Sequence, residues 1–227
     1  MEGRLKIGTE FLKLGSLYLR IGPASAFAWL TGSQGLPATS VSFMVTNPGG
    51  VNRVLFLGVV TTHFTATVPD IPVITGDLTW TQHTTQTITI STGVIRHTVF
   101  TAILGAGDPD PDVIVTCSIE HFLIDCHVFG VSSLNTASPV VQAVAGQTSG
   151  TPPLAPYTIN LAAFANGANF GFVLALSGSG VAGYAGPLTG GSLSQNGYWV
   201  LGELDPEIAL DAGSEGDTAT AFELDAL

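Results

Sequence analysis

Charged side chains are scarce in this sequence, and basic ones are the scarcest. Of the 227 residues only 10% are charged, and six Lys and Arg residues stand against 17 Asp and Glu residues, which gives a net charge of −11. Proteins that bind nucleic acids neutralise phosphates with clustered Lys and Arg, and attraction to anionic lipid needs the same residues. The composition therefore predicts neither a nucleic-acid partner nor a membrane partner.

Long apolar runs are also absent. No stretch of eighteen consecutive apolar residues occurs, so no transmembrane helix is predicted. The first residues do not resemble a secretory signal, which needs seven to fifteen continuous apolar residues, because Lys6, Gly8, Glu10 and Lys13 interrupt every candidate stretch. We therefore expect intracellular synthesis.

Cysteine is nearly missing. Cys117 and Cys126 are the only two cysteines, which is too few for a disulfide framework, and their spacing is not that of a zinc site. Since a free cysteine behaves as a small buried apolar residue, both are predicted to be reduced thiols in the core.

The few charges are distributed unevenly. Four of the six cations lie in the first twenty residues, residues 203–227 carry eight acids and no cation, and residues 21–202 contain only nine charges. A soluble monomer usually has about a quarter of its residues charged. The low charge density of residues 21–202 therefore indicates a surface that is covered by neighbouring subunits.

A basic–aliphatic–glycine triplet recurs near the N-terminus with a spacing of seven. It occurs at residues 6–8, 13–15 and 20–22. A glycine in a helix interior costs about 1 kcal/mol relative to alanine, so short strands between glycines are predicted instead of a heptad helix. We interpret residues 1–26 as an assembly arm, and the alternative is an ordinary first hairpin of the main domain. The arm residues expected to make contacts are Ile7, Gly8, Phe11, Leu14, Gly15, Leu17, Tyr18, Leu19, Ile21 and Gly22.

From residue 38 onward, β-branched runs alternate with turns rich in Gly, Pro, Asn and Asp. No segment has the pattern of an amphipathic helix. The predicted strands are Ser40–Val45, Arg53–Thr61, Leu78–Trp80, Gln86–Ile90, Arg96–Leu104, Val113–Ile119, Phe122–Val131, Tyr157–Leu161, Phe170–Ser177 and Gly197–Leu201. We predict an all-β fold for residues 27–202, an antiparallel sandwich of two sheets with jelly-roll connections. Residues 53–60 are apolar almost without alternation, which predicts a central strand covered on both faces.

Residues 203–227 are predicted to be an acidic, extended C-terminal tail with one helical turn near residues 206–210. Acidic tails rich in Gly, Ser and Ala are mobile unless something holds them. We therefore expect this tail to dock on a basic surface of a partner.

Three carboxylates alternate with prolines in Asp108-Pro109-Asp110-Pro111-Asp112. Calcium prefers several oxygen ligands that converge in one loop, so Asp108, Asp110 and Asp112 are a possible calcium site. The alternative is a solvated turn between two strands.

His121, Asp125 and His127 have odd numbers within one predicted strand, so they would share a face. Two imidazoles and a carboxylate suit zinc or a proton relay, but six residues of strand separate the two histidines by roughly 20 Å. His63, His83 and His97 are interpreted as hydrogen-bonding surface residues.

The sequence has no G-x-S-x-G elbow, no phosphate loop and no dinucleotide fingerprint. We therefore predict a protein that is not an enzyme and has no cofactor. Tyr184, Tyr198 and Trp199 flank Gly-rich segments and are a possible platform for a glycan, although most aromatic residues fill cores or interfaces.

The glycine-punctuated segment from Lys6 to Gly22 resembles the N-terminal arms of structural proteins from tailed-bacteriophage virions. Asn52–Val59 and His127–Val131 resemble a loosely defined β-sandwich module of phage and bacterial surface proteins. The resemblance implies a structural component of the virion, made in the host cytoplasm.

Capsid decoration is the preferred role, because the termini look suited to clamping adjacent subunits. The expected partners are the major capsid protein or tail components, with a homo-oligomer as the assembled form. The alternative is a receptor-binding or glycan-binding module at a tail or fibre tip.

Overall fold

The computed structural model describes residues 10–14, 17–21, 27–65, 67–147, 157–166, 169–177, 197–203, 207–210 and 217–226. Within these ranges every regular element is a β-strand and every strand pair is antiparallel, which confirms the predicted all-β sandwich. The strands are β1 Glu10–Leu14, β2 Leu17–Ile21, β3 Phe27–Gly35, β4 Ala38–Met44, β5 Arg53–His63, β6 Val73–Gly76, β7 Thr81–Ile90, β8 Gly93–Leu104, β9 Asp112–His121, β10 Leu123–Ser132, β11 Val140–Gln147, β12 Tyr157–Asn160, β13 Phe170–Ser177, β14 Gly197–Glu203, β15 Glu207–Leu210 and β16 Thr218–Leu224.

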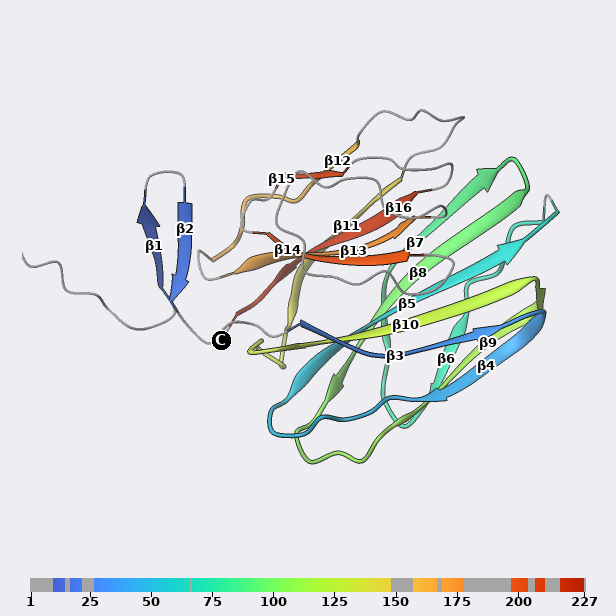
Figure 1. The fold of residues 1–227 in the computed structure, drawn as a ribbon, viewed down its shortest axis with the longest axis horizontal. Helices are drawn as coiled ribbons and strands as arrows, with labels where there is room; N and C mark the ends of the chain where they lie inside the picture. The colour runs from blue at the N-terminus through green and yellow to red at the C-terminus, as the bar shows by residue number, and fades with distance from the viewer. Residues whose placement is uncertain are drawn as a thin grey trace, which may run out of the picture.

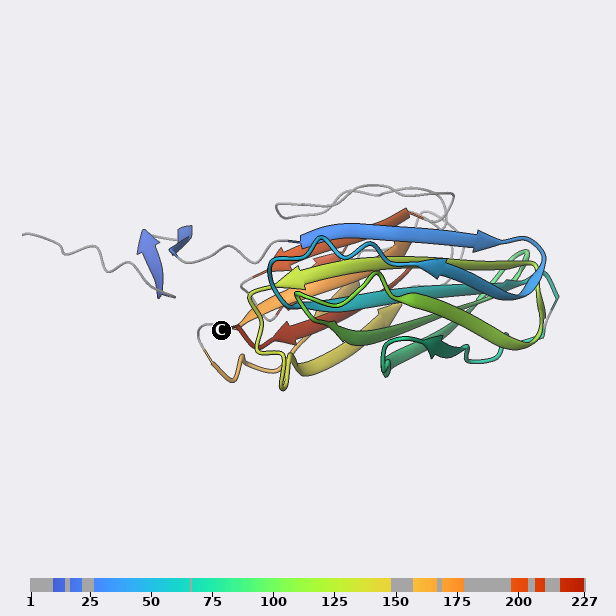
Figure 2. The ribbon, with the colours of Figure 1, turned by 90° about the horizontal axis from the view of Figure 1, so that it is seen from below.

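The sandwich has three layers (Figures 1 and 2). The middle layer is a five-stranded sheet of order β3-β10-β5-β8-β7, one outer layer is β4-β9-β6, and the other is β11-β16-β13-β14. Two separate hydrophobic clusters join the layers: one unites the middle sheet with β13 and β16, and the other unites it with β4 and β9. The structure therefore adds a third sheet to the predicted two, and the jelly-roll connectivity stays a prediction.

The middle strands β5 and β10 show why a third layer is required. All but the two end residues of β5 are buried, as are all residues of β10. Val54 and Phe56 belong to one hydrophobic cluster, whereas the residues between and after them, Leu55 and Leu57, belong to the other. Alternate side chains of a strand point to opposite faces, so both faces of β5 are shielded from solvent. This confirms the prediction that residues 53–60 form a central strand covered on both faces.

Strand β9 alternates instead, as a strand with one solvated face should. Val113, Val115 and Cys117 are buried, while Ile114 and Thr116 are exposed. The outer layer β4-β9-β6 therefore has one face on the core and one on solvent.

Five segments that the sequence analysis did not assign to strands are strands: β3, β6, β11, β15 and β16. The predicted strand Leu78–Trp80 is wrong, because the strands in this region are β6, which ends at Gly76, and β7, which begins at Thr81. Thr and Gln fill the start of β7 without an apolar alternation, so its pattern gave no clear beginning.

The prediction of a tail over residues 203–227 is corrected by the structure. β16 is an inner strand paired with both β11 and β13, and all of its residues are buried. The helical turn expected near residues 206–210 is the strand β15, which pairs with β12. Asp217 and Glu223 are buried, so these two acids belong to the fold and are not free to meet a partner.

The described residues contain no helix with the length and apolar character needed to cross a membrane.

Candidate functional site

Part of the predicted assembly arm forms a hairpin of β1 and β2. Leu14 pairs with Leu17 next to the turn, and Glu10 pairs with Ile21 at the open end. The strands lie between the three glycines of the repeat, and Figures 1 and 2 show them beside the sandwich and not within it. Phe11, Leu14, Leu17, Tyr18, Leu19 and Ile21 are on this hairpin, and Ile7, Gly8, Gly15 and Gly22 lie outside the described residues.

The predicted calcium loop uses its carboxylates as hydrogen-bond acceptors for backbone amides. Asp108 Oδ2 accepts the N–H of Gly105 at 2.7 Å, and Asp110 Oδ1 accepts the N–H of Asn47 at 2.8 Å. The backbone N–H of Asp112 donates a hydrogen bond to Asp77 Oδ2 at 2.9 Å. These hydrogen bonds stabilise the turn between β8 and β9, and the calcium site stays a prediction.

The predicted glycan platform is outside what the structure describes in side-chain detail. Tyr198 and Trp199 lie on β14, opposite Leu176 and Ala175 of β13, and Tyr184 lies outside the described residues. The platform stays a prediction.

The expected row of His121, Asp125 and His127 on one strand face is wrong. The chain turns at Phe122, so His121 ends β9 whereas Asp125 and His127 lie on β10. In β10 the two side chains form a buried pair, with His127 Nε2 3.1 Å from Asp125 Oδ1. The surface interpretation of His97 is also wrong, because its side chain is 1% exposed and burial lowers its pKa to about 3.

The turn at Phe122 instead brings His121 next to Asp70 and Cys117. The ligating atoms of these three side chains all lie within 4.8 Å of one another. Asp70 comes from the loop before β6, Cys117 from the inner face of β9 and His121 from its end. Among the described residues, no other group of three metal-ligating side chains converges in this way.

Backbone groups fix two of these side chains. His121 Nδ1 donates to the Ile119 carbonyl at 2.9 Å, and Asp70 Oδ2 accepts the N–H of Ser118. The atoms left over, His121 Nε2 and Asp70 Oδ1, face each other at 3.3 Å. The His121 side chain is completely buried, while that of Asp70 is 27% exposed.

The surroundings change the acidity of all three groups. Burial raises the pKa of the Cys117 thiol to about 12, and the charge of Asp70 adds to this effect. Burial lowers the pKa of His121 despite the opposing effects of Ile119 and Asp70. Burial acts to raise the pKa of Asp70, but the hydrogen bonds from Ser118 and the charge of His121 outweigh it, so this pKa lies below its usual value.

Two aromatic contacts join the end of β5 to the β9–β10 turn, and one of them involves His121. The His63 ring meets the His121 ring edge-on with centroids 5.8 Å apart, and His63 Nδ1 lies 2.9 Å from Thr65 Oγ1. Phe64 and Phe122, both about half exposed, are in contact, with centroids 4.0 Å apart and planes tilted by 39°.

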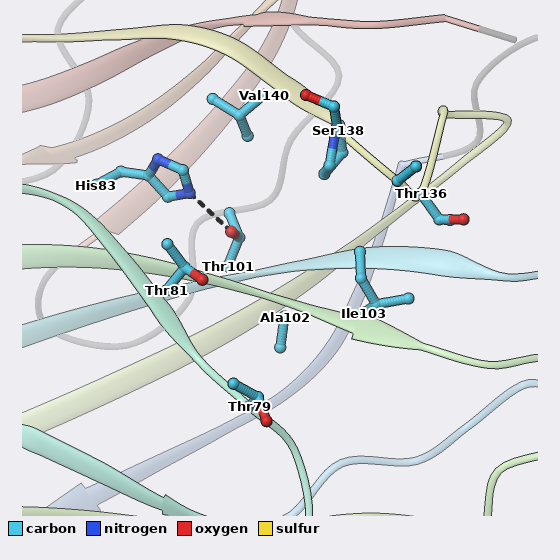
Figure 3. Close-up of a pocket in the computed structure, with 11 residues that line it drawn as sticks. Thr79, Thr81, His83, Thr101, Ala102, Ile103, Thr136, Ser138 and Val140 are labelled. Atoms are coloured by element: carbon cyan, nitrogen blue, oxygen red, sulfur yellow. Dashed lines mark hydrogen bonds between the residues drawn. The ribbon is translucent and has the colours of Figure 1, made fainter.

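A pocket of about 250 Å³ opens elsewhere, between β7, β8 and the loop before β11 (Figure 3). The register of β7 shifts between Gln82 and Thr84, and such a bulge re-aims the side chain of His83. His83 Nε2 lies 2.7 Å from Thr101 Oγ1, and Figure 3 shows the two side chains facing each other. Burial lowers the pKa of His83, and the pocket around it is lined by neutral hydroxyl and aliphatic groups.

No family model matches the sequence, and no curated protein or solved structure matches it either.

Sequence reasoning missed the Asp70 cluster because its members come from two segments 47 residues apart. The signal available was the alternation of β9, which places Cys117 and His121 on one face, and the two prolines that bracket Asp70 in Val68-Pro69-Asp70-Ile71-Pro72. Which loop meets that face depends on the pairing of β6 with β9, and the sequence did not predict β6.

Proposed function

We propose that this protein is a non-enzymatic structural protein of a tailed-phage virion, a capsid decoration subunit that contacts its neighbours through the outer face of β4-β9-β6 and through its N-terminal hairpin. The observation that carries the proposal is the composition of that outer face. The virion assignment itself comes from the resemblance of the arm and of the sandwich segments.

The outer face of β4-β9-β6 is a continuous surface without charges in its middle. Ser42, Ile114 and Thr75 form one row across the three strands, and Thr116 and Val73 lie in the next. Val73 is 61% exposed and Ile114 40% exposed, so apolar side chains stand directly in solvent. Charges lie only toward the ends of β9, at Asp112 and Glu120.

This composition favours burial by another protein. The central parts of protein interfaces are depleted of charged residues, whereas the surface of a soluble monomer is normally rich in them. Exposed apolar groups that share one face with Ser and Thr hydroxyls contribute hydrophobic burial and leave few charges to desolvate.

The N-terminal hairpin supports the same role. A two-stranded hairpin is at best marginally stable in water by itself, so β1 and β2 gain stability when a further strand or an apolar surface covers them. Pairing of an exposed strand with a neighbouring sheet is a common way for subunits to associate.

The assignment is tested by mass spectrometry of particles banded in a caesium chloride gradient, prepared from the biological source of the sequence. We expect peptides of this chain to band with the other particle proteins. Finding them only in the unbanded soluble fraction would overturn the proposal.

The contact face is tested with the double variant Val73→Asp/Ile114→Asp, and Val141→Asp on β11 is the matched control. Each control and test position is an exposed valine or isoleucine. In binding assays with particles stripped of the chain, we expect the double variant to lose binding and the control to retain it. Equal binding by both would exclude this face as the contact.

A further inference from the structure

The Asp70, Cys117 and His121 cluster presents three different metal-ligating atoms to one point. They are a carboxylate oxygen, a thiol sulfur and an imidazole nitrogen, all within 4.8 Å of one another. Cys117 is 5% exposed and His121 is completely buried, so the sulfur and the nitrogen are shielded from solvent. The Asp70 side chain is the partly exposed member of the cluster.

The hydrogen bonds of the cluster decide which atoms remain for a ligand. Because a carbonyl oxygen can only accept, the contact of His121 Nδ1 with the Ile119 carbonyl puts the ring proton on Nδ1. Nε2 of a neutral ring then carries a lone pair. This arrangement, with one ring nitrogen donating to a backbone carbonyl, is the one that orients histidine ligands in metal sites.

Asp70 is oriented in a comparable way. Its Oδ2 is tied to the Ser118 N–H, which leaves Oδ1 directed toward His121. Pro69 and Pro72, both buried, bracket the residue and restrict the loop that carries it. The carboxylate is therefore held in place before any ligand binds.

The two remaining atoms oppose each other. Asp70 Oδ1 and His121 Nε2 are 3.3 Å apart, and within the described part of the chain neither has a hydrogen-bond partner. Two lone pairs at this distance repel, and a buried polar atom without a hydrogen-bond partner destabilises the fold. A cation between the two atoms would satisfy both.

We propose that Asp70 Oδ1, Cys117 Sγ and His121 Nε2 bind a single Zn²⁺ ion. Thiolate and imidazole ligands select zinc over calcium and magnesium, which prefer oxygen ligands alone. Bonds of about 2.0 to 2.3 Å in a tetrahedron place the ligand atoms roughly 3.3 to 3.8 Å apart. The three ligand atoms now lie within 4.8 Å of one another, so they would move closer together when the ion binds.

Three protein ligands leave one tetrahedral position for a water molecule. The metal would connect the loop that carries Asp70 to the end of β9. The hydrogen bond from the Ser118 N–H to Asp70 Oδ2 already joins the same two segments. This site is independent of the virion role proposed above, since its ligands lie on the inner face and in a loop.

The first experiment is isothermal titration calorimetry with ZnCl₂, on the full chain without a polyhistidine tag after treatment with a chelator. We expect one ion per chain and a rise in melting temperature when Zn²⁺ is added, because a ligand that binds the folded state stabilises it. Absence of binding at millimolar Zn²⁺ would overturn the proposal.

Cysteine variants identify the sulfur ligand. With Co²⁺ as the probe, we expect thiolate-to-cobalt charge-transfer absorption in the unaltered chain and in Cys126→Ala, and its loss in Cys117→Ala. Cys126 is the matched control because it is also a buried free thiol. Retention of the band in Cys117→Ala would overturn the assignment.

The variant Asp70→Asn keeps the shape of a partly exposed side chain and removes its charge, so it tests the site even if a core variant fails to fold. We expect Zn²⁺ affinity to fall by at least about 10-fold, the lower limit for losing even a supporting residue of a metal site. Asp77→Asn, in the neighbouring turn, should bind as the unaltered chain does. Unchanged affinity in Asp70→Asn would exclude Asp70 as a ligand.

Discussion

The ring of Phe222 meets the ring of Phe56 edge-on, with centroids 5.1 Å apart and planes at 68°. Phe222 belongs to β16 and Phe56 to β5, so this contact joins the outer sheet to the middle sheet. Both side chains are fully buried, and both belong to the same hydrophobic cluster. A segment with the composition of a tail therefore supplies one of the largest side chains of the core.

Phe222→Ala should lower the free energy of unfolding by about 3 to 5 kcal/mol, since it removes a buried ring and leaves a cavity. The measurement is urea denaturation followed by tryptophan fluorescence. Phe122→Ala, at a position that is 47% exposed, is the control and should cost much less. Equal losses would contradict the placement of β16 in the core.

Glu223→Gln should destabilise the protein by about 2 to 3 kcal/mol. The buried carboxylate accepts hydrogen bonds from Gln142 Nε2 at 2.6 Å, Ala165 N at 2.7 Å and Asn169 Nδ2 at 2.6 Å. An amide side chain turns one acceptor into a donor that faces other donors, and hydrogen bonds to charged groups contribute about 1.5 to 3 kcal/mol. Thermal unfolding measures the loss, with Glu120→Gln on the exposed part of β9 as the control.

Gly93→Ala should destabilise the β7–β8 turn by about 2 kcal/mol or more. Gly93 has a φ of +153°, and a Cβ there would lie 2.1 Å from the His63 carbonyl oxygen. Backbone atoms must shift to make room, which adds to the strain of the conformation itself. Gly107→Ala has open space around its Cβ and should change the melting temperature little. Similar melting temperatures for the two variants would show that the turn adapts.

Acid should destabilise the fold partly through His97. Its folded pKa of about 3 lies below the value of 6.5 for an unperturbed histidine, so the unfolded chain binds a proton first. The free energy of unfolding begins to fall as the pH drops through 6.5, and it stops falling near pH 3. The loss is about 1.4 kcal/mol per pH unit, or about 2 kcal/mol at pH 5. We expect His97→Gln to lose less stability than the unaltered chain between pH 7 and pH 5 in urea denaturation. Parallel losses would show that His97 does not titrate in this range.

The strands that could be predicted are those in which the order of apolar and polar residues along the strand matches the burial of its faces. β5 reads as a continuous apolar run because both of its faces are covered, and β9 alternates because one face is solvated. β16 could not be recognised from its sequence, Thr-Ala-Thr-Ala-Phe-Glu-Leu. Its buried Thr and Glu side chains form hydrogen bonds with residues on distant segments, and the local sequence does not show these partners.

The candidate metal site was unpredictable for a related reason. A single residue that lies between the strands, Phe122, decides whether His121 continues one strand with Asp125 or ends β9. Once the chain turns there, His121 shares a face with Cys117 and meets a loop that follows β5. The residue types were visible in the sequence, but the turn and the pairing of β6 determine which of them meet.

The burial of β5 and β10 on both faces has a consequence for the motions of the protein. Each has a hydrogen-bonded strand on either side, so their amides are covered in all directions by other parts of the fold. Amide hydrogens in such strands exchange with deuterium only when the entire domain opens, whereas edge strands such as β4 and β6 exchange through local fraying. The slowest-exchanging amides of β5 and β10 would thus report the stability of the domain as a whole.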